Sequence, residues 1–276
     1  MKKIAILGPA GTFSEIAGCK YLDSIDEKME VVFYPTITKV FNSIGTECEK
    51  GIIPIENTLD GYVQLSLDLL SKTDLKIIKE FVLPIQFSFV GNIKTIEQLK
   101  KVYVQFKTQG QCVNFLEGLN DPKVIITESN GESFQKVKIG LEGEGAIIPS
   151  YILERAKGIP FVINNVTDSK ENETRFIVLS KESENYEENK NYKTSLVIMD
   201  AVYNKPGALS KILNEFAANN INLTSIVSRP TKRELGKYYF FIDIIGHSAH
   251  DGNVKKAIEI INEHNLIKIL GSYTSI

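Results

Sequence analysis

Strand-like apolar runs alternate with helical patterns over the first 180 residues, and this alternation constrains the fold more than any single motif. The predicted strands cover residues 3–7, 31–34, 51–55, 76–80, 82–90, 101–104, 123–126, 145–148 and 176–179, and the predicted helices include 14–22, 63–71, 109–119 and 151–157. Such alternation predicts an α/β architecture with largely parallel sheets. The number of strands indicates two lobes, and ligands of such sheets bind beyond the carboxyl ends of the strands.

A polar, charge-dense segment divides the chain. It reads KESENYEENKNYK at residues 181–193 and lies between two apolar runs, so we expect an exposed linker. Beyond it, strand patterns at 195–201, 221–227, 238–245 and 267–270 combine with helical patterns at 208–219 and 254–264 in the order βαββαβ. That order predicts a ferredoxin-like unit. The expected domains are therefore 1–180 and 194–276.

Composition excludes several classes of partner and site. The 276 residues carry a net charge of −2 and a pI of about 6.0, with scattered Lys and Arg, so we expect no nucleic-acid partner. No apolar stretch has the length of a membrane span, and we expect a cytoplasmic protein without a membrane partner. Cys19, Cys48 and Cys112 are odd in number and widely spaced, which argues against a disulfide framework and a zinc site. For Cys112, a buried structural thiol is favoured over a nucleophile.

Residues 8–15, GPAGTFSE, follow the first predicted strand and have the pattern of an anion site. Gly8 and Gly11 allow a tight turn, and the free N–H groups at the start of the next helix favour negative charge. Thr12 and Glu15 are spaced as a capping box, in which the hydroxyl accepts from the third helical N–H and the carboxylate reaches back. The alternative is a turn that only connects a strand to a helix.

Two later segments place polar side chains next to predicted strands. Residues 54–61, PIENTLDG, present a carboxylate, an amide and a hydroxyl in succession at Glu56, Asn57 and Thr58. Residues 172–176, NETRF, lead into another strand. The alternatives are a capped turn for the first segment and an exposed charged loop for the second. All three histidines lie beyond the linker, which excludes a His-dependent triad or a His-rich metal site from the first part of the chain.

Taken together, these motifs resemble those of the prephenate dehydratase family. They are GPAGTFSE at 8–15, PIEN at 54–57, LPI at 83–85, Gln111-Cys112 and Thr174-Arg175-Phe176, in this order. The resemblance implies a catalytic domain similar to the type II periplasmic-binding-protein fold, with the active site between its two lobes. It also implies conversion of prephenate to phenylpyruvate, water and carbon dioxide in L-phenylalanine biosynthesis. Since the sequence has no metal-ligand cluster and no dinucleotide fingerprint, we expect no cofactor.

The resemblance also implies roles for individual residues. Thr174 is expected to donate a hydrogen bond to the leaving hydroxyl, while Asn57 and Gln111 position the substrate. The role of Glu56 stays open, because a helix N-terminus favours its anion whereas a dianionic substrate raises its pKa. Arg175 either binds a substrate carboxylate through its planar fork or pairs with Glu56 or Glu173. The other expected substrate contacts are Thr12, Ser14, Thr58 and Phe176.

The C-terminal unit resembles the amino-acid-sensing ACT domain. Residues 205–209, KPGAL, open its first helix, and Ser228-Arg229-Pro230 follow its second strand. The resemblance implies feedback inhibition by L-phenylalanine at a contact between two sensor domains, bound by Asn204, Gly207, Ala208, Leu209, Ser228 and Arg229. The exposed sheet of such a unit commonly pairs with a copy of itself, so we expect a homodimer or homotetramer. The alternative is an interaction domain that has no ligand.

The chain departs from the family pattern at several positions. Residues 104–107, VQFK, stand where relatives commonly carry Ser-His-Pro-Gln, so a hydroxyl is absent at 104 and Lys107 is a candidate replacement cation. Thr58 stands in place of Ser, and Val227 replaces the usual Glu of the sensor motif. Two other functions stay open, namely arogenate dehydratase or a related prephenate-processing enzyme, and a non-catalytic small-molecule receptor.

Overall fold

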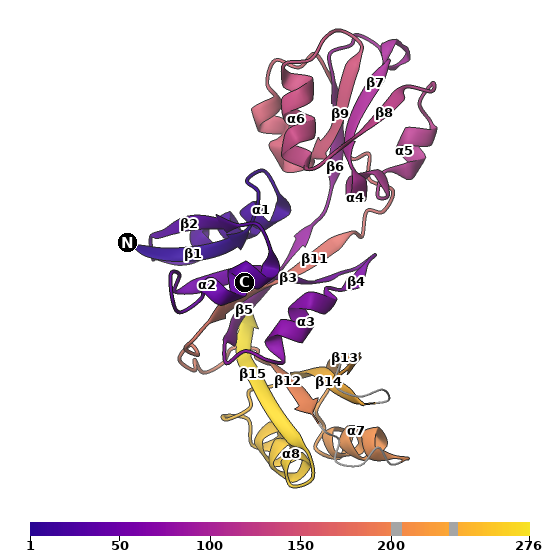
Figure 1. The fold of residues 1–276 in the computed structure, drawn as a ribbon. Helices are drawn as coiled ribbons and strands as arrows, with labels where there is room; N and C mark the ends of the chain where they lie inside the picture. Colours follow the sequence, from indigo (N-terminus) through magenta and orange to yellow (C-terminus); the bar gives the residue numbers. More distant parts are fainter. Residues whose placement is uncertain (200–205, 232–236) are drawn as a thin grey trace.

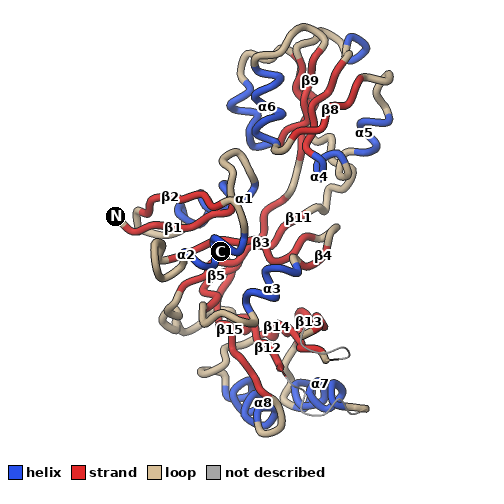
Figure 2. The backbone as a smooth tube through the Cα atoms, viewed as in Figure 1, coloured by secondary structure: helices blue, strands red, loops and turns tan. Residues whose placement is uncertain are grey.

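The computed structural model describes residues 1–199, 206–231 and 237–276. Figure 1 shows an elongated molecule with two α/β lobes and a smaller C-terminal unit beneath them. The first lobe lies between the other two parts. Two stretches of chain, at residues 85–86 and 164–172, connect its sheet to the second lobe (Figure 2).

The sheet of the first lobe has the strand order β5-β11-β3-β1-β2. Its strands are β1 (Lys2–Leu7), β2 (Met29–Tyr34), β3 (Lys50–Asn57), β5 (Lys76–Pro84) and β11 (Glu173–Ser180), with the short β4 (Gly61–Tyr62) paired to β3. The expected parallel arrangement holds for β1, β2 and β3, but β11 runs antiparallel to both of its neighbours. The reason is that β11 returns from the second lobe and enters the sheet from the opposite end.

Helices cover both faces of this sheet. On one face of the sheet, side chains such as those of Ile4 and Ile52 pack against helix α1 (Phe13–Asp23). Their neighbours Ala5 and Ile53 pack on the other face with α2 (Ile37–Ser43) and α3 (Gln64–Leu70). Because both faces are buried, the strands read as continuous apolar runs rather than alternating ones.

The second lobe contains a sheet of order β10-β6-β9-β7-β8. Its elements are β6 (Phe87–Gly91), η1 (Ile96–Gln98), β7 (Lys101–Gln105), α4 (Phe106–Gln109), α5 (Val113–Glu117), β8 (Lys123–Thr127), α6 (Asn130–Lys138), β9 (Glu144–Pro149), η2 (Ser150–Ala156) and β10 (Phe161–Ile163). Two sequence predictions are wrong here. The strand predicted at 82–90 is divided between β5 and β6, and the helix predicted at 109–119 is split into α4 and α5. The break at residues 110–112 places Gln111 between the two short helices.

The C-terminal unit has the predicted βαββαβ order. Its elements are β12 (Lys193–Met199), α7 (Ala208–Ala218), β13 (Leu223–Pro230), β14 (Tyr238–Ile245), α8 (Gly252–Asn262) and β15 (Leu266–Ser275). The sheet is antiparallel, with order β13-β14-β12-β15, and both helices pack against one face. The predicted fold class, a two-lobed α/β domain followed by a ferredoxin-like unit, is confirmed.

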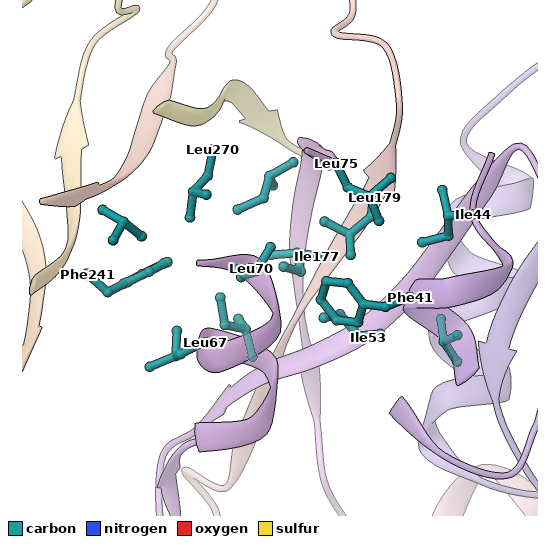
Figure 3. Packing of buried hydrophobic residues seen from close by; sticks show 14 of the residues in the cluster. Phe41, Ile44, Ile53, Leu67, Leu70, Leu75, Ile177, Leu179, Phe241 and Leu270 are labelled. Atoms are coloured by element: carbon teal, nitrogen blue, oxygen red, sulfur yellow. The ribbon is translucent and has the colours of Figure 1, made fainter. Parts of the chain in front are cut away.

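The other face of the C-terminal sheet is buried against the first lobe. Phe241 and Leu270 belong to the same apolar cluster as Leu67 and Leu70 of α3, and Figure 3 shows these side chains between the two parts. In addition, the end of β15 pairs with β5, so that the two sheets are continuous. The expectation of an exposed sheet face is therefore wrong, since the first lobe of the same chain covers it.

The polar segment at 181–192 is exposed as predicted, but it makes defined contacts with both parts. Glu184 forms an ion pair with Lys79 of β5 at 2.8 Å. The ring of Tyr186 stacks on His250 of the C-terminal unit, with centroids 3.9 Å apart. Within the described residues, no helix is both long enough and apolar enough to cross a membrane.

Gly207 provides the first testable prediction. It precedes α7 with φ of 88°, a conformation that costs a residue with a Cβ atom roughly 1–2 kcal/mol. Gly207→Ala should therefore lower the free energy of unfolding by about that amount, measured by urea denaturation. Gly252→Ala is the matched control, because Gly252 also has open space around its Cβ position but lacks a positive φ. Equal stability of the two variants would contradict the argument from backbone strain.

Candidate active site

The pairing of β3 with β11 brings two of the sequence motifs together. In this antiparallel register Asn57 lies opposite Thr174, and Glu56 lies opposite Arg175. Successive residues of a strand point to opposite faces of the sheet, so the two pairs project in opposite directions. The structure thereby separates residues that the sequence analysis had placed in one site.

The Asn57 side chain is held at both of its polar ends. Its Nδ2 donates to Thr174 Oγ1 at 3.0 Å and lies 2.9 Å from the backbone oxygen of Glu173. Its Oδ1 accepts from the backbone N–H groups of Leu59 and Asp60 at 2.9 and 3.0 Å. Because Thr174 Oγ1 accepts from Asn57, its own hydrogen is directed elsewhere. Among the residues that the structure describes, none accepts from the Thr174 hydroxyl.

Asn172 connects this pair to the second lobe. It is fully buried, its Oδ1 accepts from Asn57 Nδ2 at 2.9 Å, and its Nδ2 donates to Gln111 Oε1 at 3.1 Å. The chain Asn57–Asn172–Gln111 therefore runs from β3 to the break between α4 and α5. Sequence reasoning quoted Asn172 as the first residue of a motif but gave it no role. A buried side-chain amide that bridges two lobes is visible only once the lobes are placed.

Thr58 fixes the loop before β11 rather than presenting its hydroxyl outward. Its Oγ1 donates to the backbone oxygen of Glu171 at 2.8 Å and accepts from the N–H of Glu173 at 3.0 Å. Both hydrogen bonds hold the residues on either side of Asn172. The structure thus supports a positioning role for Thr58.

The GPAGTFSE segment lies where the two lobes approach each other. Gly11 is close enough to Gly131, at the start of α6, that an added Cβ would be 3.6 Å from the Gly131 Cα. The N-termini of α1 and α6 are thus neighbours, and the N-terminus of a helix favours an anion. Ser14, in the first turn of α1, is buried in this region.

The predicted capping box at Thr12 is half correct. The Glu15 carboxylate reaches back and accepts from the N–H of Gly11 at 2.5 Å. The Thr12 side chain does not cap the helix, and its Oγ1 is buried without a hydrogen-bond partner among the described residues. A buried hydroxyl of this kind is costly unless a ligand or water satisfies it. Thr12 therefore stays a candidate substrate contact.

Arg175 and Phe176 lie elsewhere than predicted. The Arg175 guanidinium is directed to the C-terminal unit, where Nη2 donates to Asp243 at 2.6 Å, and Nη1 lies 3.3 Å from Glu56. This is the pairing alternative, and it removes both Arg175 and Glu56 from the substrate side. Phe176 is 2% exposed and stacks on Phe81 in the core. We correct its predicted role from substrate contact to core packing.

The remaining polar cluster consists of amides and hydroxyls. Cys112 adds no nucleophile, since burial, with a smaller contribution from Asp168, raises the pKa of its thiol to about 12. Val104 is buried in the core of the second lobe, and Lys107 is exposed on α4. In the described part of the chain, no group of three His, Cys, Asp or Glu side chains is arranged to hold a metal ion. The cluster is suited to donating hydrogen bonds and to placing anions.

The predicted effector residues fall into three groups. Gly207, Ala208 and Leu209 form the start of α7, and Ser228 is exposed on β13. Asn204 lies outside the described residues. Arg229 forms a bidentate ion pair with Asp68 of α3, at 3.0 and 3.2 Å from its Nη2. This pair anchors the C-terminal unit to the first lobe, and the contact of Arg229 with an effector stays a prediction.

Comparison with known proteins agrees with this architecture. The prephenate dehydratase family profile matches residues 4–184, and the ACT domain profile matches residues 195–263. The prephenate dehydratase of Methanocaldococcus jannaschii is 34% identical, covering 96% of this chain and 95% of that protein. The bifunctional chorismate mutase/prephenate dehydratase of Aquifex aeolicus is also 34% identical, over 98% of this chain and 73% of that protein.

A solved structure is similar to this chain in both fold and sequence. The crystal structure of prephenate dehydratase from Arthrobacter aurescens in complex with L-Phe superimposes with a TM-score of 0.81 at 28% identity, covering 99% of this chain and 90% of that one. Since the family profile spans more than half of the chain and the relatives align over nearly all of it, this chain belongs to the prephenate dehydratase family.

Proposed function

We propose that the chain converts prephenate to phenylpyruvate, water and carbon dioxide. The observation that carries the proposal is the Asn57–Thr174 hydrogen bond, which orients the threonine hydroxyl as a donor at the junction of the two lobes. Membership of the prephenate dehydratase family supports the same reaction.

The chemistry requires a donor more than a base. Prephenate loses a carboxylate as carbon dioxide and a ring hydroxyl as water, and the aromatisation of the ring drives both departures. One proton must reach the leaving oxygen. A threonine hydroxyl is too weak an acid to ionise fully, so Thr174 acts by oriented hydrogen-bond donation or by relaying a proton. Asn57 holds the Thr174 oxygen as an acceptor, which leaves the hydroxyl hydrogen to be donated to another group.

The dianionic substrate also needs fixed positions for its carboxylates. The adjacent N-termini of α1 and α6 and the unpartnered Thr12 hydroxyl supply donors of the required kind. Gln111, which accepts from Asn172, extends the polar surface into the second lobe. Binding between the lobes thereby fixes the substrate relative to Thr174.

The direct test is incubation of the purified chain with prephenate, with phenylpyruvate and carbon dioxide both measured. A parallel incubation with arogenate separates a prephenate enzyme from an arogenate dehydratase. Binding of prephenate without turnover would instead indicate a receptor and overturn the proposal.

Thr174 gives the sharpest kinetic prediction. Thr174→Ala should lower kcat by roughly tenfold to a thousandfold with a smaller change in KM, because the lost donor acts mainly on the transition state. Thr174→Ser should keep more of the activity, since it retains the hydroxyl. Steady-state kinetics on both variants tests this. Equal losses would point to packing of the threonine methyl group.

Asn172 is the positioning residue that the structure adds. Asn172→Ala should lower kcat by about tenfold or more, because Asn57 and Gln111 lose their common partner. Asn92→Ala is a suitable control, since the Asn92 side-chain amide donates to the backbone oxygens of Val137 and Gly140, both in the second lobe. If both variants lose stability but only Asn172→Ala loses turnover, the bridging role is supported.

Regulation by L-phenylalanine is part of the proposal. The ACT domain and the L-Phe complex of the Arthrobacter aurescens relative support L-phenylalanine as the effector. We place its site at the start of α7, where Gly207 allows close approach of a ligand to the backbone. Calorimetric titration with L-phenylalanine should show binding to the wild-type chain and to Gly252→Ala, and weaker binding to Gly207→Ala. Unchanged binding by Gly207→Ala would place the effector elsewhere.

We also infer a homodimer or homotetramer in the cytoplasm. Within the described residues β13 pairs only with β14, which leaves one strand edge open for a second copy. Cys48 and Cys112 are buried thiols that form no disulfide, as expected for a reducing compartment. Measurement of the native mass in solution tests the oligomeric state.

A further inference from the structure

The β3–β11 ladder has a second polar face, opposite the candidate active site. Asn57 and Thr174 lie on one side, and the adjacent pair Glu56 and Arg175 lies on the other. The second side faces the C-terminal unit. Thr174, the proposed hydrogen-bond donor, is therefore adjacent in β11 to Arg175, which contacts the C-terminal unit.

Arg175 is enclosed by charged groups from both parts of the chain. Its side chain is 11% exposed, with Nη2 2.6 Å from Asp243 Oδ2 and Nε 2.9 Å from Glu80 Oε2. Glu80 also pairs with Lys193 at the start of β12. Burial lowers the pKa of Arg175, but Asp243, Tyr273 and Glu80 more than offset this and raise it above its ordinary value. The guanidinium is charged and fixed.

Asp243 is the C-terminal unit's carboxylate in this cluster. It is fully buried on β14, where its Oδ1 accepts from Ser195, and Ser195 in turn lies 2.6 Å from the Tyr273 hydroxyl. A fully buried carboxylate is tolerated only when it is paired and hydrogen-bonded. Asp243 and Arg175 therefore constrain each other strongly across the domain boundary.

The ladder between β11 and β3 is irregular next to Arg175. The register of β11 against β3 shifts between Arg175 and Phe176, and the residue opposite Phe176 is Pro54. Since proline has no backbone N–H, it cannot donate to the ladder at this point. On its other side β11 pairs with β5 in unbroken register from Glu173 to Val178, which holds the backbone of this segment. Side-chain contacts with Asn57 on one face and Asp243 on the other add to that pairing.

We propose that Asp243 of the C-terminal unit is a positioning residue for the reaction, which sets the Thr174 hydroxyl through its ion pair with Arg175. A displacement of β14 would move Arg175, and with it the neighbouring Thr174. The inference rests on the proposed function, because it is measured as turnover of prephenate.

The test compares Asp243→Asn with Asp68→Asn. Both remove one charge from a buried ion pair between the C-terminal unit and the first lobe, but Asp68 pairs with Arg229, away from the β3–β11 ladder. Asp243→Asn should lower kcat by roughly tenfold to a hundredfold with KM within about twofold, since small misplacements of a donor are costly. Asp68→Asn should keep kcat within about twofold at a temperature where circular dichroism shows both to be folded.

A double-mutant cycle separates positioning from general damage. If Asp243 acts through the Thr174 hydroxyl, Asp243→Asn should lower kcat less than about threefold in a Thr174→Ala background. The non-enzymatic rate of prephenate breakdown is subtracted in each case. Equal losses in the two backgrounds would overturn the inference.

Two isosteric variants keep the test decisive if Asp243→Asn does not fold. Tyr273→Phe removes the hydroxyl beside Ser195 and Arg175, whereas Tyr239→Phe removes the hydroxyl that donates to Asp68 at 2.9 Å. Only Tyr273→Phe should lower kcat, and again only when Thr174 is present. If the wild-type chain turns over prephenate and the Asp243 and Tyr273 variants do so equally well, the positioning role is wrong but the proposed function stands. An inactive wild-type chain would overturn the proposed function.

Discussion

The insertion of β11 between β3 and β5 is the interaction on which the rest of the structure depends. This strand brings the chain back from the second lobe into the centre of the first sheet, antiparallel to its neighbours. It fixes the relative position of the lobes, closes the core around Phe176 and Val178, and leads into the linker. It also carries Thr174. A change in how β11 sits would therefore affect both the lobes and the candidate site.

The apolar cores bring the lobes and the C-terminal unit together, and polar bridges between these parts then fix the positions of individual side chains. The Asn57–Asn172–Gln111 chain crosses between the lobes, and the Arg175–Asp243 pair crosses to the C-terminal unit. Buried bridges of this kind contribute little net stability, because desolvation offsets most of the attraction. Their effect is on geometry, since a misplaced partner leaves a buried polar group unsatisfied. The candidate site thus lies where the amide chain and the ion pair both meet the β3–β11 ladder.

Local patterns were sufficient to predict most of the elements, because buried strands and amphipathic helices depend on the residues within them. The βαββαβ order and the approach of residues 57 and 174 followed from motif positions and family resemblance. The direction of Arg175 did not, since its strongest partner, Asp243, lies 68 residues further along the chain. For the same reason Asn172 was missed. The orientation of Arg175 and the position of Asn172 both depend on the antiparallel direction of β11. That direction arises because the chain passes through the second lobe before it returns to the first.

The contacts of β13 suggest how an effector could reach the site. Alternate side chains of β13 face the first lobe. Ser225 accepts a hydrogen bond from Tyr62, and Arg229 forms an ion pair with Asp68. The same strand is an edge of the described sheet. A second copy or an effector that shifts β13 acts on its partner β14, which carries Asp243. Because the shared sheet face is packed against α3, a shift of β14 would have to be accommodated by side chains of the first lobe rather than by solvent.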